Sequence, residues 1–172
     1  MRLKDKVAII TGGSRGIGFA TADAFLREGA KVAVAASSEK NAEAAVEKLK
    51  AIHPDAEVVG ISPNLGSFES VKEEFDKVEK QFGRIDILVN NAGVSESTPF
   101  TSYTEADFDR VIDLKVKGVF NATRAVVDGM IKNHSGVVLN TSSMVSISGQ
   151  PSGFAYPASK FAVNGTTISL AR

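Results

Sequence analysis

The stretch VAIITGGSRGIG, residues 7–18, joins a short apolar run to a glycine-rich turn and the start of a helical pattern. The run VAIIT is rich in β-branched residues and shows no polar alternation, which is typical of a strand buried on both faces. Gly12, Gly16 and Gly18 follow with the spacing G-x-x-x-G-x-G. A tight turn and a close approach of the backbone to phosphate both need residues without a side chain, and a helix amino terminus offers free N–H groups to an anion. A purely structural turn is the alternative interpretation.

The same alternation of strand and helix patterns continues along the chain, with no repeat, low-complexity tract or linker. We predict strands at residues 7–11, 32–36, 57–61, 85–90 and 136–141, and helices at 17–28, 40–52, 68–82, 104–133 and from 156 onward. This alternation predicts an α/β fold with a parallel sheet, and right-handed crossovers favour a doubly wound sheet in the strand order 3-2-1-4-5. Ligands of such sheets bind at the carboxyl ends of the strands.

The composition argues against several classes of function. The 172 residues include 20 basic and 20 acidic side chains, so the net charge is zero and no surface for nucleic acid or an anionic membrane is expected. There is no cysteine, and the two histidines, His53 and His134, stand far apart in polar settings and are expected on the surface. We therefore predict neither a metal site nor a Ser-His-Asp triad. The amino terminus has only a short apolar run, which predicts no signal peptide or membrane span and a cytoplasmic location.

Further clusters follow the last two predicted strands. The residues NNAG, 90–93, supply small and amide side chains that can accept a flat ring, although an ordinary Asn-Gly turn is the alternative. The residues NTSSMVS follow the next strand and include Ser143. Tyr156 comes thirteen residues later and stands four residues ahead of Lys160, so the two are neighbours on a helix. Pro157 places them in its first turn. Taken alone, Tyr156 and Lys160 would be explained equally well as two side chains that pack on one helix face.

Together, the glycine turn, NNAG, Ser143 and Tyr156-x-x-x-Lys160 resemble, in this order and spacing, the short-chain dehydrogenase/reductase family. The resemblance extends over the whole chain and is greatest to the 3-oxoacyl-[acyl-carrier-protein] reductases and to bacterial hydroxysteroid dehydrogenases, including those that act on bile acids. It implies that residues 1–172 form a single NAD(P)-binding Rossmann domain. It also implies an oxidoreductase that interconverts a secondary alcohol and a ketone by hydride transfer.

The resemblance assigns a role to each catalytic candidate. Tyr156 is the expected general acid and base: a phenol titrates near pH ~10, and both the Lys160 ammonium and an oxidised nicotinamide favour the phenolate. Lys160 is also expected to hold the nicotinamide ribose, and Ser143 to donate a hydrogen bond to the substrate oxygen. The residues that the resemblance assigns to the coenzyme are Gly12, Ser14, Arg15, Gly16, Ile17, Gly18, Ser37, Asn64, Leu65, Asn91, Ala92, Gly93, Tyr156 and Lys160.

The residues after the second predicted strand bear on the choice of coenzyme. A site that prefers NAD places Asp or Glu there to bind the ribose 2′-hydroxyl. This chain has the neutral residues Ala36, Ser37 and Ser38, and Glu39 comes later. Arg15, in the glycine turn, is suited to meet a 2′-phosphate. We therefore predict a preference for NADP(H), with NAD(H) possible because of Glu39.

The central helix departs from the family pattern. The family usually has a catalytic asparagine there, and the matching residue in this chain is Lys115. Helical spacing of the apolar residues places Lys115 on their inward face; they are Phe108, Val111, Ile112, Val119 and Phe120. An inward lysine either disturbs the active site, which lowers turnover, or extends its side chain to water without effect.

The length is the second departure. Family members usually continue well beyond the helix that starts near Tyr156, so we expect a chain truncated after this helix, without the family's last two strands. A catalytically impaired or non-catalytic dinucleotide-binding module is therefore the alternative function. An S-adenosylmethionine-dependent methyltransferase is a more distant one, because it explains the glycine turn but not the Tyr-x-x-x-Lys pair.

The resemblance also implies partners. They are a small-molecule alcohol or ketone and further copies of this chain, which would pair through the helices at 104–133 and 156–172. A homodimer is favoured over a tetramer, because the last strand of the family forms the second interface. No nucleic-acid or membrane partner is expected.

Overall fold

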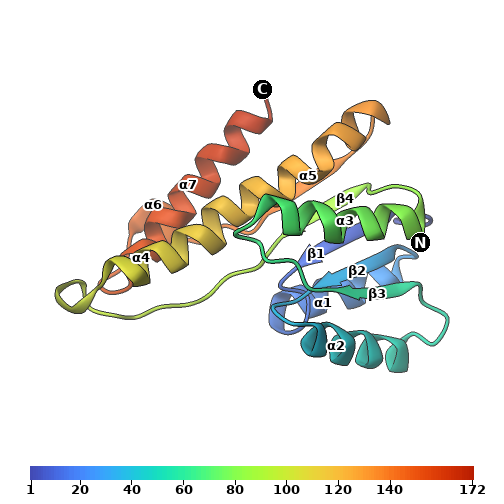
Figure 1. Ribbon diagram of the computed structural model, residues 1–172, viewed down its shortest axis with the longest axis horizontal. Coiled ribbons are helices and arrows are strands. Elements are labelled where there is room, and N and C mark those ends of the chain that lie inside the picture. Colours follow the sequence, from blue (N-terminus) through green and yellow to red (C-terminus); the bar gives the residue numbers. More distant parts are fainter.

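The computed structural model describes residues 1–172, and a five-stranded parallel sheet forms its centre. The strands lie in the order β3-β2-β1-β4-β5 (Figure 1). Their bounds are Val7–Thr11 for β1, Lys31–Ala35 for β2, Val58–Ile61 for β3, Ile87–Asn90 for β4 and Val137–Asn140 for β5. Every pairing is parallel. The predicted doubly wound sheet and its strand order are confirmed.

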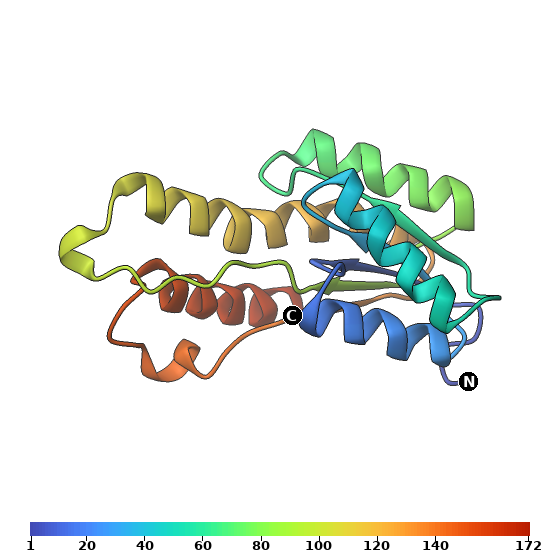
Figure 2. The ribbon, with the colours of Figure 1, turned by 90° about the horizontal axis from the view of Figure 1, so that it is seen from below.

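Helices cover both faces of the sheet. Helices α1 (Gly16–Arg27) and α2 (Glu39–Ile52) pack on one face, and α3 (Phe68–Phe82) and α5 (Gly118–Lys132) on the other. Figure 2 shows these layers edge-on, with α3 and α5 above the strands and α1 below them. Successive side chains of a strand point to opposite faces, so each inner strand contributes to both cores. This explains why the apolar runs of β1 and β2 show no polar alternation.

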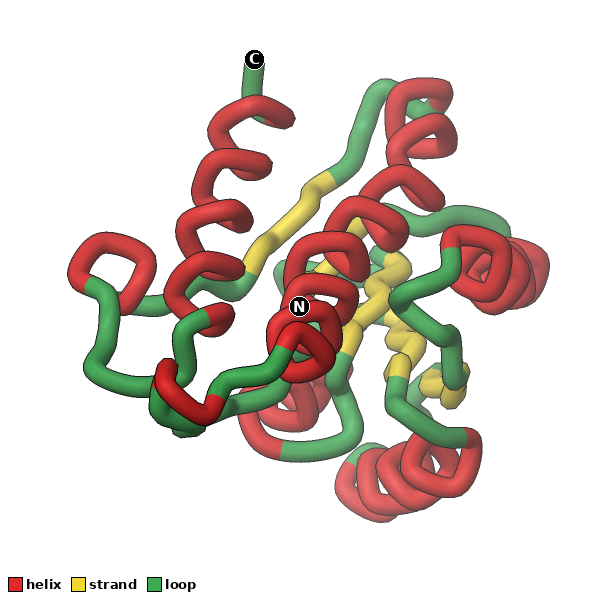
Figure 3. Tube along the Cα trace, turned by 60° about the vertical axis from the view of Figure 1, so that its left-hand side comes forward, coloured by secondary structure: helices red, strands yellow, loops and turns green.

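An arm of helices extends beyond the carboxyl ends of the strands. It contains η1 (Phe100–Ser102), α4 (Glu105–Ile112), the π-helical turn η2 (Asp113–Lys117), α6 (Val145–Ser148) and α7 (Ala155–Leu170). Helix α7 packs against α4, η2 and α6, so the segment that follows β5 lies beside the crossover between β4 and β5 (Figures 1 and 3). The arm brings the segment after β4 next to the segment after β5.

The predicted helix at 104–133 is interrupted. It starts as expected, with a capping box between Thr104 and Asp107, but η2 separates α4 from α5. A π-helical turn accommodates an extra residue, which changes the phase of the side chains that follow it. Lys115 is buried as predicted, whereas Phe108 and Phe120, also predicted on the inward face, are 36% and 60% exposed. The prediction is therefore wrong for both phenylalanines. At about 100° per residue, Phe120 stands roughly 180° from the buried Val111, so even an unbroken helix would not turn it inward.

Two other predictions need correction. The run that forms β5 predicted burial on both faces, but Val137 and Leu139 are 50% and 47% exposed. Strand β5 is the outer strand, and only Val138, which points to the other face, packs against the core. His53, predicted on the surface, is half-buried, and its Nε2 lies 2.7 Å from Oδ1 of Asp23 on α1.

No helix of the chain combines the length and the apolar character that crossing a bilayer requires.

Candidate active site

A cleft of about 1080 Å³ opens at the carboxyl ends of the strands. Its walls come from the turn after β1, the residues that follow β2, β3 and β4, and the end of α4 with η2. The residues assigned to the coenzyme that line it are Gly12, Ser14, Arg15, Gly16, Ile17, Ser37, Asn64, Leu65, Asn91, Ala92 and Gly93. The chain therefore brings together, from four separate connections, residues that the sequence grouped only by resemblance.

The three glycines of the G-x-x-x-G-x-G spacing meet different steric conditions. Gly12 has a φ of +65°, and an added Cβ would lie 2.8 Å from Cα of Ala92. A Cβ on Gly18 would collide with the carbonyl oxygen of Gly12 and with Nδ2 of Asn91. Gly16 has a φ of +55° and nothing within 4 Å of an added Cβ. Gly12 and Gly18 thus allow close packing inside the protein, whereas Gly16 leaves open space in the cleft wall.

The amino terminus of α1 borders the same cleft and has no internal cap. No side chain of the chain accepts a hydrogen bond from its first turn, and that turn contains no acidic residue. The first N–H groups of a helix lack intrahelical partners and carry a partial positive charge. These unpaired N–H groups can donate to a phosphate, and Gly16 has no side chain to block its approach. The residues therefore fit the pyrophosphate of a dinucleotide.

A set of hydrogen bonds holds the glycine turn against the end of β4. Oγ1 of Thr11 accepts from the backbone N–H groups of Asn91 and Ala92, each at 3.0 Å. Nδ2 of Asn91 donates to the carbonyl oxygens of Thr11 and Gly12, at 3.1 and 3.3 Å. The amide of Asn91, which the sequence offered to a bound ring, thus fixes the shape of the cleft. Thr11 was missed, although a hydroxyl at the last residue of β1 is a visible signal.

Asn64 also forms hydrogen bonds within its own turn. Its Oδ1 accepts from the backbone N–H of Gly66 at 3.0 Å, and its own N–H donates to Oγ of Ser70 at 2.9 Å. These bonds shape the turn between β3 and α3, where Asn64 and Leu65 face the cleft.

Tyr156 and Lys160 lie at the start of α7, as predicted, but they do not line the cleft itself. Lys160 is 7% exposed, and its Nζ donates to the carbonyl oxygen of Thr141, just after β5. This Nζ lies 5.8 Å from the centre of the Tyr156 ring. Burial lowers the pKa of Lys160. The buried ammonium is thus fixed beside the phenol by the end of the neighbouring strand.

Lys115 reaches the same phenol from η2. Its Nζ lies 4.2 Å from the centre of the Tyr156 ring, and the residue is 4% exposed. The side chain is thus enclosed by its neighbours rather than lying along the surface. Burial in the first place, and then the charge of Lys160, lower the pKa of Lys115 to about 8, against an opposite effect of Glu96.

Lys115 also stands directly behind the cleft wall. A Cβ added to Gly93, which lines the cleft, would lie 2.7 Å from Nζ of Lys115. A side chain at this position would require the ammonium to shift. Nζ therefore lies between the Gly93 backbone and the Tyr156 ring.

Ser143 lies two residues before the start of α6, and this segment is attached to α7. Oγ of Ser142 donates to Oδ1 of Asn164 at 2.6 Å, and Nδ2 of Asn164 donates to Oγ of Ser146 at 2.9 Å. Oγ of Ser143 accepts from the N–H of Val145 at 3.4 Å. An accepting hydroxyl keeps its own hydrogen available, so Ser143 can still donate to a ligand.

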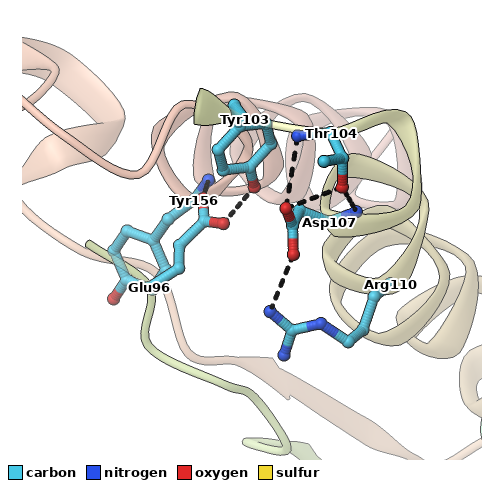
Figure 4. A network of polar contacts seen from close by, with 6 residues as sticks. All are labelled: Glu96, Tyr103, Thr104, Asp107, Arg110 and Tyr156. Carbon is cyan, nitrogen blue, oxygen red and sulfur yellow. Dashed lines mark hydrogen bonds and ion pairs between the residues drawn. The ribbon is translucent and has the colours of Figure 1, made fainter. Parts of the chain in front are cut away.

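Glu96 and Tyr103 belong to the site region and were missed. Figure 4 shows the Glu96 carboxylate between the Tyr103 hydroxyl and the backbone of Tyr156. Oε1 accepts from the Tyr156 N–H at 2.6 Å, and Oε2 accepts from the Tyr103 hydroxyl. Desolvation and the Glu96 carboxylate raise the pKa of Tyr103 to about 12, which keeps it a donor. The carboxylate caps the first turn of α7, a contact between distant residues that no local pattern reveals.

The comparisons with known proteins agree with this geometry. A family model described as short chain dehydrogenase matches residues 6–172. The chain is 51% identical over 172 residues to a 3alpha-hydroxysteroid dehydrogenase of Mediterraneibacter gnavus. It is 40% identical over 172 residues to the 3-oxoacyl-[acyl-carrier-protein] reductase FabG of Thermotoga maritima. Both alignments include the whole of this chain and 69% of the relative.

Solved structures show the same similarity. The crystal structure of levodione reductase superposes with a TM-score of 0.94 at 36% identity, over 99% of this chain and 66% of that one. NAD⁺-bound xylitol dehydrogenase gives a TM-score of 0.94 at 32% identity, over 99% of this chain and 65% of that one. The chain thus spans about two thirds of the length of these proteins.

Proposed function

The chain belongs to the short-chain dehydrogenase family, and from this membership we propose that residues 1–172 form one dinucleotide-binding domain that interconverts a secondary alcohol and a ketone. The observation that carries the proposal is the fixed position of Lys160 beside Tyr156, behind a cleft that suits a dinucleotide. The coenzyme, when bound, supplies or accepts the hydride. The similarity to a 3alpha-hydroxysteroid dehydrogenase and to an acyl-thioester reductase supports a ketone of one of these classes as the substrate.

The residues of the chain would divide the proton chemistry among themselves. The Tyr156 hydroxyl gives a proton to the substrate oxygen during reduction and takes it back during oxidation. The Lys160 ammonium, held by the Thr141 carbonyl, favours the phenolate during that exchange. The free hydrogen of the Ser143 hydroxyl would stabilise the charge that develops on the substrate oxygen.

Charges along the cleft support a preference for NADP(H). Arg15 and Lys48 line it together with Ser37, which follows β2. Glu39, the residue that left NAD(H) possible, begins α2 and does not line this cleft. A 2′-phosphate would therefore meet two cations and no carboxylate at this end. Lys48 was missed by the sequence reasoning because it stands three turns into α2, far from any motif.

The test is coenzyme oxidation, followed by absorbance, with a steroid ketone, an acetoacetyl thioester and a small cyclic diketone. We expect turnover with one of these ketones, and NADPH to bind about tenfold more tightly than NADH, as one charge-assisted hydrogen bond to a phosphate allows. Calorimetry with both coenzymes measures the preference independently of turnover. Equal or tighter binding of NADH would contradict the coenzyme assignment, and absence of turnover with every ketone would contradict the enzymatic one.

One observation favours a second candidate function, a coenzyme-binding module with little or no catalysis. Lys115 takes the place of the family's asparagine and lies 4.2 Å from the centre of the Tyr156 ring. An ammonium donates hydrogen bonds but accepts none, so Lys115 cannot hold a proton-relaying water as an amide can. Tight binding of NADPH without turnover, together with turnover restored by Lys115→Asn, would identify this second function.

We also propose that the chain forms a homodimer. Large apolar side chains of α5 and α7 are exposed; they are Phe120, Ile131, Phe161 and Ile168. Large exposed apolar side chains are typical of an interface between copies. We expect light scattering to give the mass of a dimer at micromolar concentration. A monomer under these conditions would contradict the proposal.

A further inference from the structure

We propose that Lys115 makes the coenzyme site discriminate between the two redox states of a nicotinamide coenzyme, in favour of the reduced one. The inference rests on the proposed function, because it requires this coenzyme in the cleft. The oxidised nicotinamide ring carries a positive charge that the reduced ring lacks, and the rest of the coenzyme is the same. A fixed cation near the ring therefore affects one form and not the other.

The position of Lys115 places its charge at the reacting end of the cleft. Hydride transfer and proton transfer act on the two atoms of one carbonyl group, so the nicotinamide ring must come close to the tyrosine that handles the proton. Nζ of Lys115 lies 4.2 Å from the centre of that tyrosine ring and directly behind Gly93 of the cleft wall. No residue of the described chain separates this ammonium from Gly93.

The surrounding charges do not neutralise the Lys115 ammonium. From α7, Lys160 adds a second cation, 5.8 Å from the centre of the same Tyr156 ring. From the segment after β4, Glu96 is the opposing carboxylate, and its two oxygens already accept from Tyr103 and Tyr156. On the elements of Lys115 itself, Arg110 is a further cation, and Asp113 is exposed and lies 3.8 Å from Lys117.

Like charges in a partly dry site repel with an energy that water would largely remove. Burial of Lys115 therefore increases the effect of its charge on a cationic ring. The same repulsion acts between Lys115 and Lys160, which is one of the causes of the lowered pKa of Lys115. An oxidised nicotinamide ring would bring a further positive charge into the site and would also lower the pKa of Lys115.

The pH dependence follows from the pKa of about 8. Below this value Lys115 is charged, and the oxidised coenzyme is disfavoured. Above it Lys115 is neutral, and the discrimination disappears. By reciprocity, binding of the oxidised coenzyme should release a proton from Lys115 near neutral pH, whereas binding of the reduced coenzyme should not.

The experiment measures dissociation constants for NADP⁺ and NADPH by calorimetry, at pH ~7 and pH ~9, on either side of this pKa. The proteins are the unchanged chain and the variants Lys115→Met and Lys115→Asn, which remove the charge with different shapes. We expect both variants to bind NADP⁺ about tenfold more tightly at pH ~7, equivalent to about 1.4 kcal/mol, with little change for NADPH. In the unchanged chain we expect the same gain between pH ~7 and pH ~9.

Lys48→Met is the matched control, because it removes a cation from the distant end of the same cleft. It should weaken both redox forms alike and leave their ratio unchanged. A ratio that is the same in the unchanged chain, in the Lys115 variants and at both pH values would overturn this inference while the proposed function stands. If neither redox form binds the unchanged chain, the proposed function fails and this inference with it. The pH comparison needs no variant, so a Lys115 variant that fails to fold does not prevent the test.

Discussion

Replacing Tyr156 by phenylalanine should reduce turnover by ~10²–10⁴-fold, the usual contribution of a general acid or base. The change removes the hydroxyl and keeps the ring, so the contacts of both lysines with the ring face remain. The backbone N–H of residue 156 still donates to Glu96, and the start of α7 is therefore preserved. Coenzyme affinity should change little.

Tyr103→Phe provides the matched control, since Tyr103 is the chain's other tyrosine and also contacts Glu96. It removes a hydroxyl that donates to a carboxylate but lies on a different segment from the proposed proton donor. We expect less than about a tenfold loss of turnover, in line with one lost hydrogen bond. Steady-state rates and calorimetric coenzyme affinities for both variants distinguish the two roles. Retention of more than a few per cent of activity by Tyr156→Phe would show that another group transfers the proton.

Gly18→Ala should abolish high-affinity coenzyme binding and destabilise the fold. The added Cβ would overlap the carbonyl oxygen of Gly12 and approach Nδ2 of Asn91 to 2.6 Å. The oxygen belongs to the backbone, so the glycine turn or α1 has to move. Overpacking of this kind costs about 1–3 kcal/mol. Displacement of the phosphate-binding turn should weaken coenzyme binding by about 100-fold, equivalent to about 3 kcal/mol.

Gly165→Ala is the control, because Gly165 lies in α7 with nothing within 4 Å of an added Cβ. Alanine is favoured over glycine in a helix interior by about 1 kcal/mol, so this variant should be slightly more stable than the unchanged chain. Thermal unfolding and calorimetry with NADPH measure both effects. An unchanged coenzyme affinity in Gly18→Ala would show that the turn does not depend on close packing at this residue.

The candidate site could be predicted where its residues belong to local motifs. The glycine turn, the residues after β4, and the Tyr156–Lys160 pair each occupy a few consecutive positions at the end of a strand or the start of a helix. Glu96 was missed because it contributes through a hydrogen bond to a distant part of the chain, and Lys48 and Tyr103 were missed because they stand outside every motif. Glu96 is 60 residues from the N–H that it caps.

The sequence by itself determined the strand order and the location of the cleft. Unbroken β-branched runs that alternate with helical patterns permit few parallel arrangements, and right-handed crossovers favour a doubly wound order such as this one. Glycine in the first turn and small residues after β4 then restrict where the backbone can approach a ligand. These constraints are local, so they can be read from residue types and spacing.

Only the tertiary structure decided the environment of Lys115. The π-helical turn η2 interrupts the predicted helix, and Lys115 within it is buried, while Phe108 and Phe120 on the flanking helices are exposed. Whether an inward lysine reaches water depends on what the folded chain places around it. Here Gly93, Tyr156 and Lys160 come from the segment after β4 and from α7, and together they hold an ammonium against a phenol ring. Burial and repulsion between charges depend on distances across the fold, and the order of residues along the chain does not specify these distances.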